Sequence, residues 1–390
     1  MAPFLSSVSC ACALGGDSRE VLGNLLAGNP LWFKEVEGEV PGRKVWFGAV
    51  DAPLPTISDP EYDFRANRLL LHAFRQFGDV WTGFASRHAP DRVAVVLGAS
   101  NTGIDEAQGH VDEWLDAGGP PAAFRFSQVE LGTPSEFLRK IAGLKGPAYT
   151  VSTACSSGAK AFAAAWRIIE CGIADAAVVG GVDGKCRFAL NGFNALGALS
   201  CGRCRPLADD RDGINLGEGV ALFLMEKESV SCSDGFPVHV RLMGVGETSD
   251  ACHATSPDPD GRGAEMAMRE AMRQANASSR DVAYVNLHGT ATAANDLMEM
   301  RAVARIFFGD DEVDASPAEV CRMMLEKGVT CESTKSLTGH CLGAAGAVEA
   351  AICWLLVASG RVNGVALSNS FAFGGSNSCV AMAPEIREAS

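Results

Sequence analysis

Cys155 is the side chain in this sequence best placed to act as a nucleophile. It lies in the run ACSSG, after the β-rich residues 149–153 and before a segment in which apolar residues recur at helical spacing. At the start of a helix, unpaired backbone N–H groups and the helix dipole favour a thiolate. A cysteine taken blindly from the fourteen in the chain is more often a small buried hydrophobe, so the position is what singles out Cys155.

Two histidines and a lysine stand in comparable loops. His288 follows the apolar residues 282–287 and opens the loop HGTATAAND, before a helix that we expect to begin near Leu297. Lys335 and His340 stand in the run KSLTGH, before a helix rich in small residues. Catalytic groups gather at the carboxyl ends of strands in α/β sheets. A histidine that merely caps a loop explains either residue alone, but the set of four is more specific.

A glycine-rich turn, NSFAFGGSN at residues 369–377, is a further candidate. Gly374 and Gly375 allow positive φ and a close approach of the backbone to a ligand, so an N–H group here could serve an oxyanion hole. A plain tight turn between two β segments is the alternative. Phosphate binding is disfavoured, because the chain has neither a dinucleotide-binding glycine spacing nor the lysine-containing phosphate loop.

Two segments that carry these loops share one layout of strand, polar loop, small-residue helix and strand. The predicted elements are strands at 149–153, 176–179 (ended by Gly180-Gly181), 328–332 and 362–367, and a helix at 342–358. Such alternation predicts an α/β fold with mostly parallel sheets covered by helices.

A shift in composition at residues 230–235 marks the join between the two segments. We therefore divide the chain into an N-terminal half, 1–235, which carries Cys155, and a C-terminal half, 236–390, which carries the two histidines and the lysine.

Composition excludes several classes of protein. With 390 residues, 47% of them hydrophobic, and a net charge of −14, neither a disordered chain nor a bulk nucleic-acid binder fits. The most apolar run, 350–358, is too short to span a membrane, and the N-terminus lacks the basic region of a secretory signal. The cysteines are scattered without regular spacing, which favours reduced thiols and a cytoplasmic protein.

Seven ordered motifs extend this reading to almost the whole chain. They are DRVAVVLGAS, GLKGPAYTVSTACSSGA, RPLADDRDGINLGEG, SDACHATSPDPDG, NLHGTATAAND, STKSLTGHCLGAAGAVEA and NSFAFGGSN. With them the sequence closely resembles the β-ketoacyl-acyl carrier protein synthases, the elongating condensing enzymes of the thiolase superfamily. Degradative thiolases use a second catalytic Cys, and the initiating synthases typically use Cys-His-Asn, so the Cys-His-His set discriminates. The resemblance implies a thiolase-like fold, in which two pseudo-symmetric halves make five layers, α-β-α-β-α.

The resemblance also implies a reaction. Cys155 would take an acyl chain from acyl carrier protein, and the N–H groups of Cys155 and Phe373 would form the oxyanion hole. A malonyl thioester on carrier protein would lose CO2, and its enolate would attack the acyl group. His288 and His340 would stabilise the charge that develops on the thioester oxygen. Phe373 would also be the aromatic gate to the acyl pocket.

Supporting roles follow from the same resemblance. Lys335 would organise the site through Glu349, because a buried Lys–Glu pair fixes geometry. Thr290 and Thr292 would hydrogen-bond the phosphopantetheine arm, and Asp296 matches the family Asp that follows them. No cofactor or metal is implied, since the substrates are carried on the phosphopantetheine of the carrier protein.

The implied partners are acyl carrier protein and a second subunit. Carrier proteins are typically acidic, so an acidic synthase needs a local basic patch, for which Arg203 and Arg205 are candidates by position. The family is normally dimeric, so we expect a homodimer or a heterodimer with a ketosynthase-like chain-length factor.

The chain departs from the usual family pattern at a few positions. Ala372 stands where a Gly is common, and its Cβ removes easy access to positive φ, which predicts a stiffer gate. Asn295 replaces a common Gly, Ser376 a common Thr, and the loop 201–206 is short. The C-x-x-C in that loop has no second pair at zinc-site spacing, so a structural role is favoured over metal or redox work.

Four functions therefore compete. The first is a 3-oxoacyl-[acyl carrier protein] synthase of fatty-acid elongation, and the second is a type II polyketide or aryl-polyene ketosynthase that works beside a chain-length factor. A non-catalytic chain-length factor is disfavoured by the intact Cys155, His288 and His340. A Cys–His hydrolase would leave the second histidine and Lys335 without a task.

Overall fold

The structure is a computed structural model that describes residues 2–228, 235–310 and 314–385. The join predicted at 230–235 falls, apart from Gly235, outside these residues. Within the described ranges, no helix is long and apolar enough to cross a lipid bilayer.

Ten strands form one hydrogen-bonded ladder, in the order β11-β10-β12-β13-β9-β1-β8-β6-β4-β5. The N-terminal strand group comprises β1 (Phe4–Ala11), β4 (Val93–Gly98), β5 (Ala148–Val151), β6 (Ala176–Asp183) and β8 (Gly219–Glu226). The C-terminal strand group comprises β9 (Val240–Ser249), β10 (Val282–Asn286), β11 (Thr330–Glu332), β12 (Val365–Ala372) and β13 (Ser376–Pro384). The two groups meet where the first residues of β1 pair with β9.

The two strand groups repeat one arrangement. In the N-terminal group β5, β4 and β6 are parallel, and β8 and β1 follow antiparallel. In the C-terminal group β11, β10 and β12 are parallel, and β13 and β9 follow antiparallel. This repetition confirms the two pseudo-symmetric halves. The expectation of mostly parallel sheets is wrong, because each group ends in antiparallel strands.

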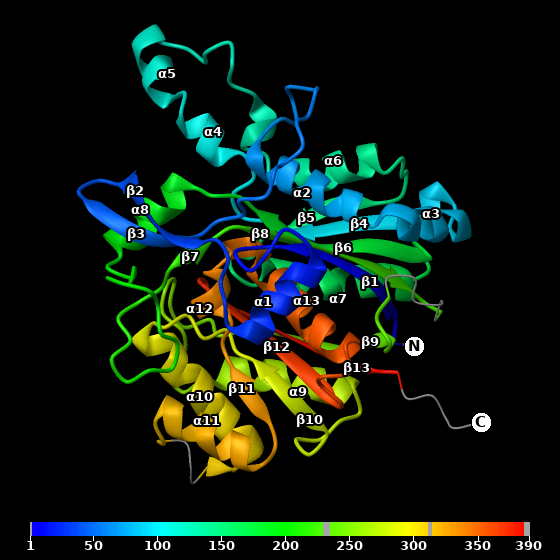
Figure 1. Cartoon of the computed structure of the whole chain (residues 1–390), viewed down its shortest axis with the longest axis vertical. Coiled ribbons are helices and arrows are strands. Elements are labelled where there is room, and N and C mark those ends of the chain that lie inside the picture. Colours follow the sequence, from blue (N-terminus) through cyan, green and yellow to red (C-terminus); the bar gives the residue numbers. More distant parts are fainter. Residues whose placement is uncertain (1, 229–234, 311–313, 386–390) are drawn as a thin grey trace.

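Helices cover both strand groups and fill the space between them, which gives five layers (Figure 1). α2 (Arg65–Gln76) and α6 (Thr133–Ile141) cover the outer face of the N-terminal group, next to α3 (Gly78–Arg87). α7 (Ser157–Glu170) and α13 (Ala345–Ala358) contact strands of both groups and form the middle layer. α9 (Arg262–Gln274) covers β9 and β13 of the C-terminal group, α11 (Pro317–Glu326) packs on β11, and α10 (Ala293–Phe307) contacts both helices.

The middle layer is packed without space for larger side chains. Every residue of α13 is buried, including Trp354, whose indole N–H donates to the Leu5 carbonyl at 2.8 Å. A Cβ on Gly158 of α7 would lie 2.7 Å from the backbone N of Ala347, and one on Gly346 of α13 would lie 2.7 Å from the backbone N of Ala159. The glycines therefore let the two helices approach closely, as the small-residue pattern predicts.

Several predicted boundaries move. β6 runs on to Asp183 through Gly180. Glycine is needed inside the strand here, because a Cβ at Gly180 would lie 1.9 Å from the Ala221 carbonyl of β8. α10 begins at Ala293 instead of Leu297, so its polar first turn is helical. A 3₁₀ turn, Leu342–Ala344, precedes α13. β12 starts three residues late, because the Val362 N–H closes the end of α13 on the Leu356 carbonyl.

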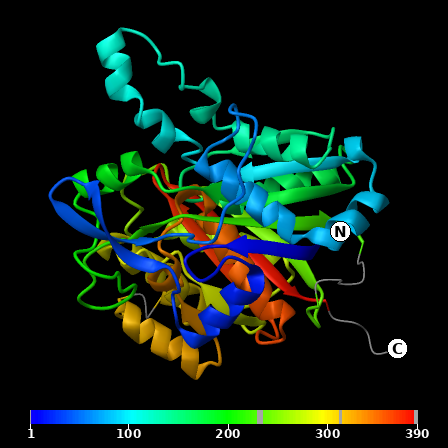
Figure 2. The ribbon, with the colours of Figure 1, turned by 45° about the horizontal axis from the view of Figure 1, so that its top comes forward.

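Smaller elements surround this body. A three-stranded sheet contains β2 (Phe33–Val40), β3 (Arg43–Gly48) and β7 (Leu216–Gly217), and short helices are α1 (Ser18–Ala27), α8 (Arg187–Ala195) and α12 (Lys335–Thr338). α4 (Ile104–Gln108) and α5 (Val111–Ala117) form a lobe that projects from the body in both views (Figures 1 and 2).

Candidate active site

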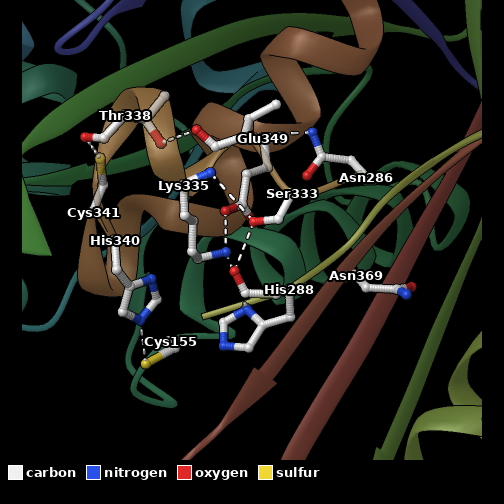
Figure 3. Close-up of polar contacts among 12 residues, drawn as sticks. Cys155, Asn286, His288, Ser333, Lys335, Thr338, His340, Cys341, Glu349 and Asn369 are labelled. Atoms are coloured by element: carbon white, nitrogen blue, oxygen red, sulfur yellow. Dashed lines mark hydrogen bonds and ion pairs between the residues drawn. The ribbon is translucent and has the colours of Figure 1, made fainter. Parts of the chain in front are cut away.

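The loops that follow β5, β10 and β11 bring the four predicted chemical side chains together (Figure 3). Cys155 stands between β5 and α7, and His288 follows β10. Lys335 and His340 stand between β11 and α13. The site therefore combines one loop of the N-terminal half with two loops of the C-terminal half.

The backbone is strained next to these residues. Ala154, directly before Cys155, has φ 52°, and Leu342, two residues after His340, has φ 50°. Non-glycine residues rarely adopt this left-handed conformation, and it is kept where surrounding contacts enforce it. At Ala154 the Ser157 hydroxyl donates to its carbonyl at 2.5 Å and accepts from the Thr153 N–H at 2.8 Å.

Cys155 and His340 form the shortest contact between the reactive groups. The Cys155 Sγ lies 2.9 Å from His340 Nε2, and both residues are buried. Burial raises the pKa of the Cys155 thiol to about 12. The prediction of a helix-stabilised thiolate is therefore wrong for the resting site, because burial outweighs the position before α7, and Cys155 is a neutral thiol facing an imidazole.

Both histidines are neutral in this environment. Burial, followed by the charge of Lys335, holds the pKa of His340 well below its ordinary value. The same two causes, and then His340, hold the pKa of His288 well below that value. The ring centroids are 5.2 Å apart, with the planes nearly perpendicular. Neutral imidazoles of this kind can present N–H groups to an oxygen that gains negative charge.

Lys335 and Glu349 form an ion pair inside the protein. Their side chains are 1% and 2% exposed, and Lys335 Nζ also lies 3.4 Å from His288 Nδ1. Burial raises the pKa of Glu349 to about 7, although Lys335 lowers it. The structure thus places the ammonium between the predicted partner carboxylate and a histidine, which fits an organising position.

Glu299 of α10 is a site residue that sequence reasoning missed. Its carboxylate accepts the N–H groups of His288 and Gly289, both at 2.8 Å, and the Asn369 amide at 3.0 Å. Burial raises the pKa of Glu299 to about 7. The sequence signal was a glutamate three residues after Asp296, on the same face of an amphipathic helix.

Asp296 and the two threonines shape the neighbouring loop. Asp296 accepts the N–H groups of Leu207 at 2.8 Å and Ala291 at 3.1 Å, so it ties together two loops without lining the cavity. The hydroxyls of Thr290 and Thr292 are 2.9 Å apart, and both residues line the cavity.

A cavity of about 450 Å³ leads to the reactive groups. Cys155, His288 and His340 stand among its lining residues, with Phe373 further along. Phe373 is 40% exposed, and its ring lies 5.6 Å from that of Phe193. The predicted gate residue therefore borders the passage to the predicted nucleophile.

The glycine-rich turn is a hairpin connection between β12 and β13. Ala372 pairs with Ser376, which leaves Phe373, Gly374 and Gly375 as the loop. The positive φ angles fall on Gly374, at 84°, and Gly375, at 73°. Ala372 lies in the strand and does not need a positive φ. The stiffer gate predicted from its Cβ therefore loses its reason.

The predicted docking arginines point to other tasks. Arg203 donates to the Ser336 carbonyl at 2.7 and 2.9 Å, and its guanidinium lies over the Phe33 ring. Arg205 pairs with Asp210 at the surface. Neither residue lines the cavity. Carrier-protein docking by Arg203 and Arg205 stays a prediction, and both side chains are exposed.

Cysteine and histidine at this site also fit a metal by residue type. The ligating atoms of Cys155, His288 and His340 lie within 4.8 Å of one another. The Lys335 ammonium beside His288 opposes a cation there. The Cys201–Cys204 pair belongs to no such group in the part of the chain that the structure describes. Cys204 instead donates weakly to the Lys335 carbonyl at 3.5 Å.

Two family models match the chain. The model described as "Beta-ketoacyl synthase, N-terminal domain" matches residues 34–231, and "Beta-ketoacyl synthase, C-terminal domain" matches residues 239–366. The chain is 37% identical over 268 residues to 3-oxoacyl-[acyl-carrier-protein] synthase 2 of Rhizobium meliloti (strain 1021), covering 60% of each protein. It is 32% identical over 286 residues to the enzyme of the same name from Staphylococcus aureus (strain COL), covering 71% of this chain and 65% of that one.

Solved structures extend the similarity to nearly the full chain. A chain of the complex of the ketosynthase ApeO with its chain length factor ApeC, from Xenorhabdus doucetiae, is 36% identical, with a TM-score of 0.86 and 98% coverage of both chains. The ishigamide ketosynthase/chain length factor is 23% identical, with a TM-score of 0.83 and 99% coverage of both, and shows the same fold.

Proposed function

The chain belongs to the β-ketoacyl synthase family, and from that premise we propose that it is a 3-oxoacyl-[acyl carrier protein] synthase. It catalyses the decarboxylative condensation of a malonyl thioester with an acyl chain held on Cys155. The observation that carries the proposal is the contact of 2.9 Å between the Cys155 thiol and His340, beside a second neutral histidine. A hydrolase reading leaves His288 and the buried Lys335–Glu349 pair without a task.

In the first half-reaction the Cys155 sulfur attacks the thioester carbonyl of an acyl carrier protein. The bond to the pantetheine sulfur breaks, and that sulfur leaves with the proton that the thiol gives up. His340 Nε2 lies where it can pass this proton. The N–H groups of Cys155 and Phe373 receive the oxyanion, since both residues line the cavity. The product is an acyl-Cys155 thioester.

In the second half-reaction the malonyl thioester loses CO2 and leaves an enolate. His288 and His340 donate N–H groups to the enolate oxygen, which is why their neutral state matters. The enolate carbon attacks the acyl carbonyl, the bond to the Cys155 sulfur breaks, and the sulfur leaves as a thiolate that takes a proton from water. Thr290 and Thr292 hold the pantetheine arm in the cavity, and Lys335 and Glu349 keep His288 in place.

Intact-protein mass spectrometry tests the first step. We expect an acyl mass on the protein after incubation with acyl carrier protein, and none on Cys155→Ala. With malonyl carrier protein added, CO2 and a 3-oxoacyl product should appear. Cys201→Ala is a matched control, because this cysteine is exposed and lies outside the cavity. Absence of an acyl mass on the unmodified protein would rule out the synthase.

A second candidate is a type II polyketide or aryl-polyene ketosynthase that works beside a chain-length factor. The favouring observation is the 36% identity over 98% of a chain from a complex of ketosynthase and chain length factor. Light scattering with a condensation assay separates the two. An active homodimer of this chain alone supports fatty-acid elongation, whereas activity only after a second ketosynthase-fold subunit is added supports the polyketide or polyene role.

We also propose a partner, the absence of a cofactor and a location for the protein. Acyl carrier protein is the macromolecular partner, and no cofactor takes part, because the acyl groups arrive on its phosphopantetheine. A cytoplasmic location is supported by the free thiols of the thirteen described cysteines.

A further inference from the structure

Asp183, the last residue of β6, is a buried carboxylate that the mechanism above does not use. It does not line the cavity and cannot touch substrate there. Its oxygens accept the Asn101 N–H at 2.8 Å, the Ser100 N–H at 2.9 Å and the Ser100 hydroxyl at 2.7 Å. All of these donors belong to the loop that follows β4.

The same carboxylate reaches the other half of the molecule. The Gly343 N–H donates to Asp183 Oδ2 at 2.7 Å. Gly343 is the third residue after His340 and follows Leu342, whose φ is 50°. A strained residue keeps its conformation only while its neighbours are fixed. The bond to Asp183 therefore holds the turn that follows His340.

The loop after β4 and the turn at Gly343 both adjoin the start of α7, which follows Cys155. The backbone of Gly98, at the end of β4, lies so close to α7 that a Cβ there would be 2.3 Å from the Gly158 N. A Cβ on Gly158 would in turn lie 3.0 Å from the Gly343 carbonyl oxygen. The turn that Asp183 holds therefore packs directly against the helix start that follows Cys155.

We propose that Asp183 is a positioning residue that sets the separation of His340 from Cys155 across the two halves. The proposal rests on the proposed function for the meaning of that separation. His340 has a second anchor in the N-terminal half, because its N–H donates to the Asn215 carbonyl at 2.8 Å and its carbonyl accepts from the Gly217 N–H at 3.0 Å. Asp183 supplies the constraint on the downstream side.

Burial of Asp183 is costly, which separates this contact from an incidental one. Removal from water raises the pKa of Asp183 to about 6, and the donors of Ser100, Asn101 and Gly343 act against that rise. The carboxyl is therefore mostly ionised at neutral pH and is balanced by hydrogen bonds in place of a cation.

Asp183→Asn is the direct test. The amide nitrogen of Asn must face either the Gly343 N–H or the N–H groups of Ser100 and Asn101, so the link between the β4 loop and the turn at Gly343 is weakened while the volume stays the same. We expect condensation from preloaded acyl-enzyme to slow about 100-fold, the usual cost of a misplacement near 1 Å. Acylation of Cys155 should slow less, because it uses His340 alone, whereas condensation uses both histidines at once.

Two further variants keep the test independent of folding in Asp183→Asn. Gly343→Ala retains the carboxylate but places a Cβ 2.7 Å from Asp183 Oδ2, so it should lower the ratio of condensation to acylation in the same way. Ser100→Ala removes one donor of several and should lower the ratio only slightly.

Glu226→Gln is the matched control. Glu226 is a buried carboxylate at the opposite end of the same strand pair, where it binds Arg87 and His88. The substitution should reduce the stability of the protein without changing the ratio of condensation to acylation. This ratio is measured per molecule of folded, acylated protein.

Alkylation supplies a readout that needs no carrier protein. Iodoacetamide should modify Cys155 more slowly in Asp183→Asn and Gly343→Ala, with the exposed Cys171 as internal reference in peptide mass spectrometry. Wild-type ratios and alkylation rates in both variants would overturn the positioning role. A wild-type protein that is not acylated overturns the proposed function instead, so the two failures are distinguishable.

Discussion

The reactive side chains of this site carry no charge at rest. Burial raises the pKa of the Cys155 thiol and lowers those of both histidines, so the ion pair of Lys335 with Glu349 is the charge nearest to them. In the proposed reaction, negative charge appears only on the substrate, as an oxyanion or an enolate. The site therefore acts through oriented N–H donors, which need no reorganisation when that charge develops.

His340→Ala should separate the two half-reactions. Loss of the imidazole removes a donor to the enolate oxygen, and one such donor is worth on the order of 10²–10³ in rate. We expect an acyl-Cys155 that still forms to completion, more slowly, and an elongation rate that falls by that factor. Mass spectrometry follows the acyl-enzyme, and product chromatography follows elongation. Elongation at the wild-type rate would remove His340 from the mechanism.

Sequence reasoning found the residues whose chemistry depends on their own loop. Cys155, His288, Lys335 and His340 each follow a strand and precede a helix, and this context is local. Asp183 and Glu299 escaped, because their importance lies in the partners they hold. The Asp183 partners Ser100 and Gly343 are 83 and 160 residues away along the chain, and most of the donors are backbone N–H groups that no side-chain pattern marks.

At the scale of elements, the small residues of α7 and α13 decide how closely the two halves approach. The pattern predicted helices packed on several sides, and the structure shows the contacts between Gly158, Gly346 and the backbone of the facing helix. The 3₁₀ turn before α13 was not foreseen, because Leu342-Gly343-Ala344 reads as helix in sequence. Its geometry is imposed by tertiary hydrogen bonds.

Gly346→Ala should therefore destabilise the protein. The added Cβ meets the Ala159 backbone at 2.7 Å, and overpacking of this kind costs about 1–3 kcal/mol. Gly23→Ala in α1 is the control, because a Cβ there has nothing within 4 Å, and alanine stabilises a helix interior by about 0.5–1 kcal/mol. Urea unfolding of both variants measures the effects. Equal shifts of one sign would show that the helices can separate at no cost.

At the scale of the whole molecule, buried carboxyls give stability a distinctive dependence on pH. Glu299 has its pKa raised from 4.5 to about 7. Below pH 4.5 the folded and unfolded states both hold the proton, and the contribution is complete. As the pH rises from 4.5 to the folded pKa of about 7, the unfolded state ionises while the buried carboxyl keeps its proton, and roughly 3 kcal/mol of stability is lost.

Glu299→Gln should remove that loss. Between pH 5 and pH 8, we expect the unfolding free energy of the wild type to fall relative to that of the variant. Urea unfolding at each pH measures both free energies. Glu270→Gln is the control, because Arg273 lowers the pKa of Glu270 to about 2, so its effect on stability should be flat between pH 5 and pH 8 and change only below pH 4.5. Parallel pH curves for wild type and Glu299→Gln would show that Glu299 does not titrate in this range.

The repeated strand order was partly visible in the sequence, since two segments share a layout of strand, loop, helix and strand. The antiparallel ends of each group were not, because β1 pairs with β8 and β9, and β9 pairs with β13, all across long stretches of the chain. Local periodicity identifies a strand, but its neighbour is chosen by the packing of the finished layers.

The middle layer also fixes when this protein can fold during its synthesis. α7 leaves the ribosome early, but its neighbour α13 follows only after residues 171–344 have been made, roughly 10–35 s later at usual rates of synthesis. Throughout that interval α7 covers the inner face of the N-terminal strands without α13. A nascent chain in this condition exposes the apolar face of the sheet, to which chaperones bind. A message truncated before codon 358 yields a product that lacks part of α13 and cannot complete its core.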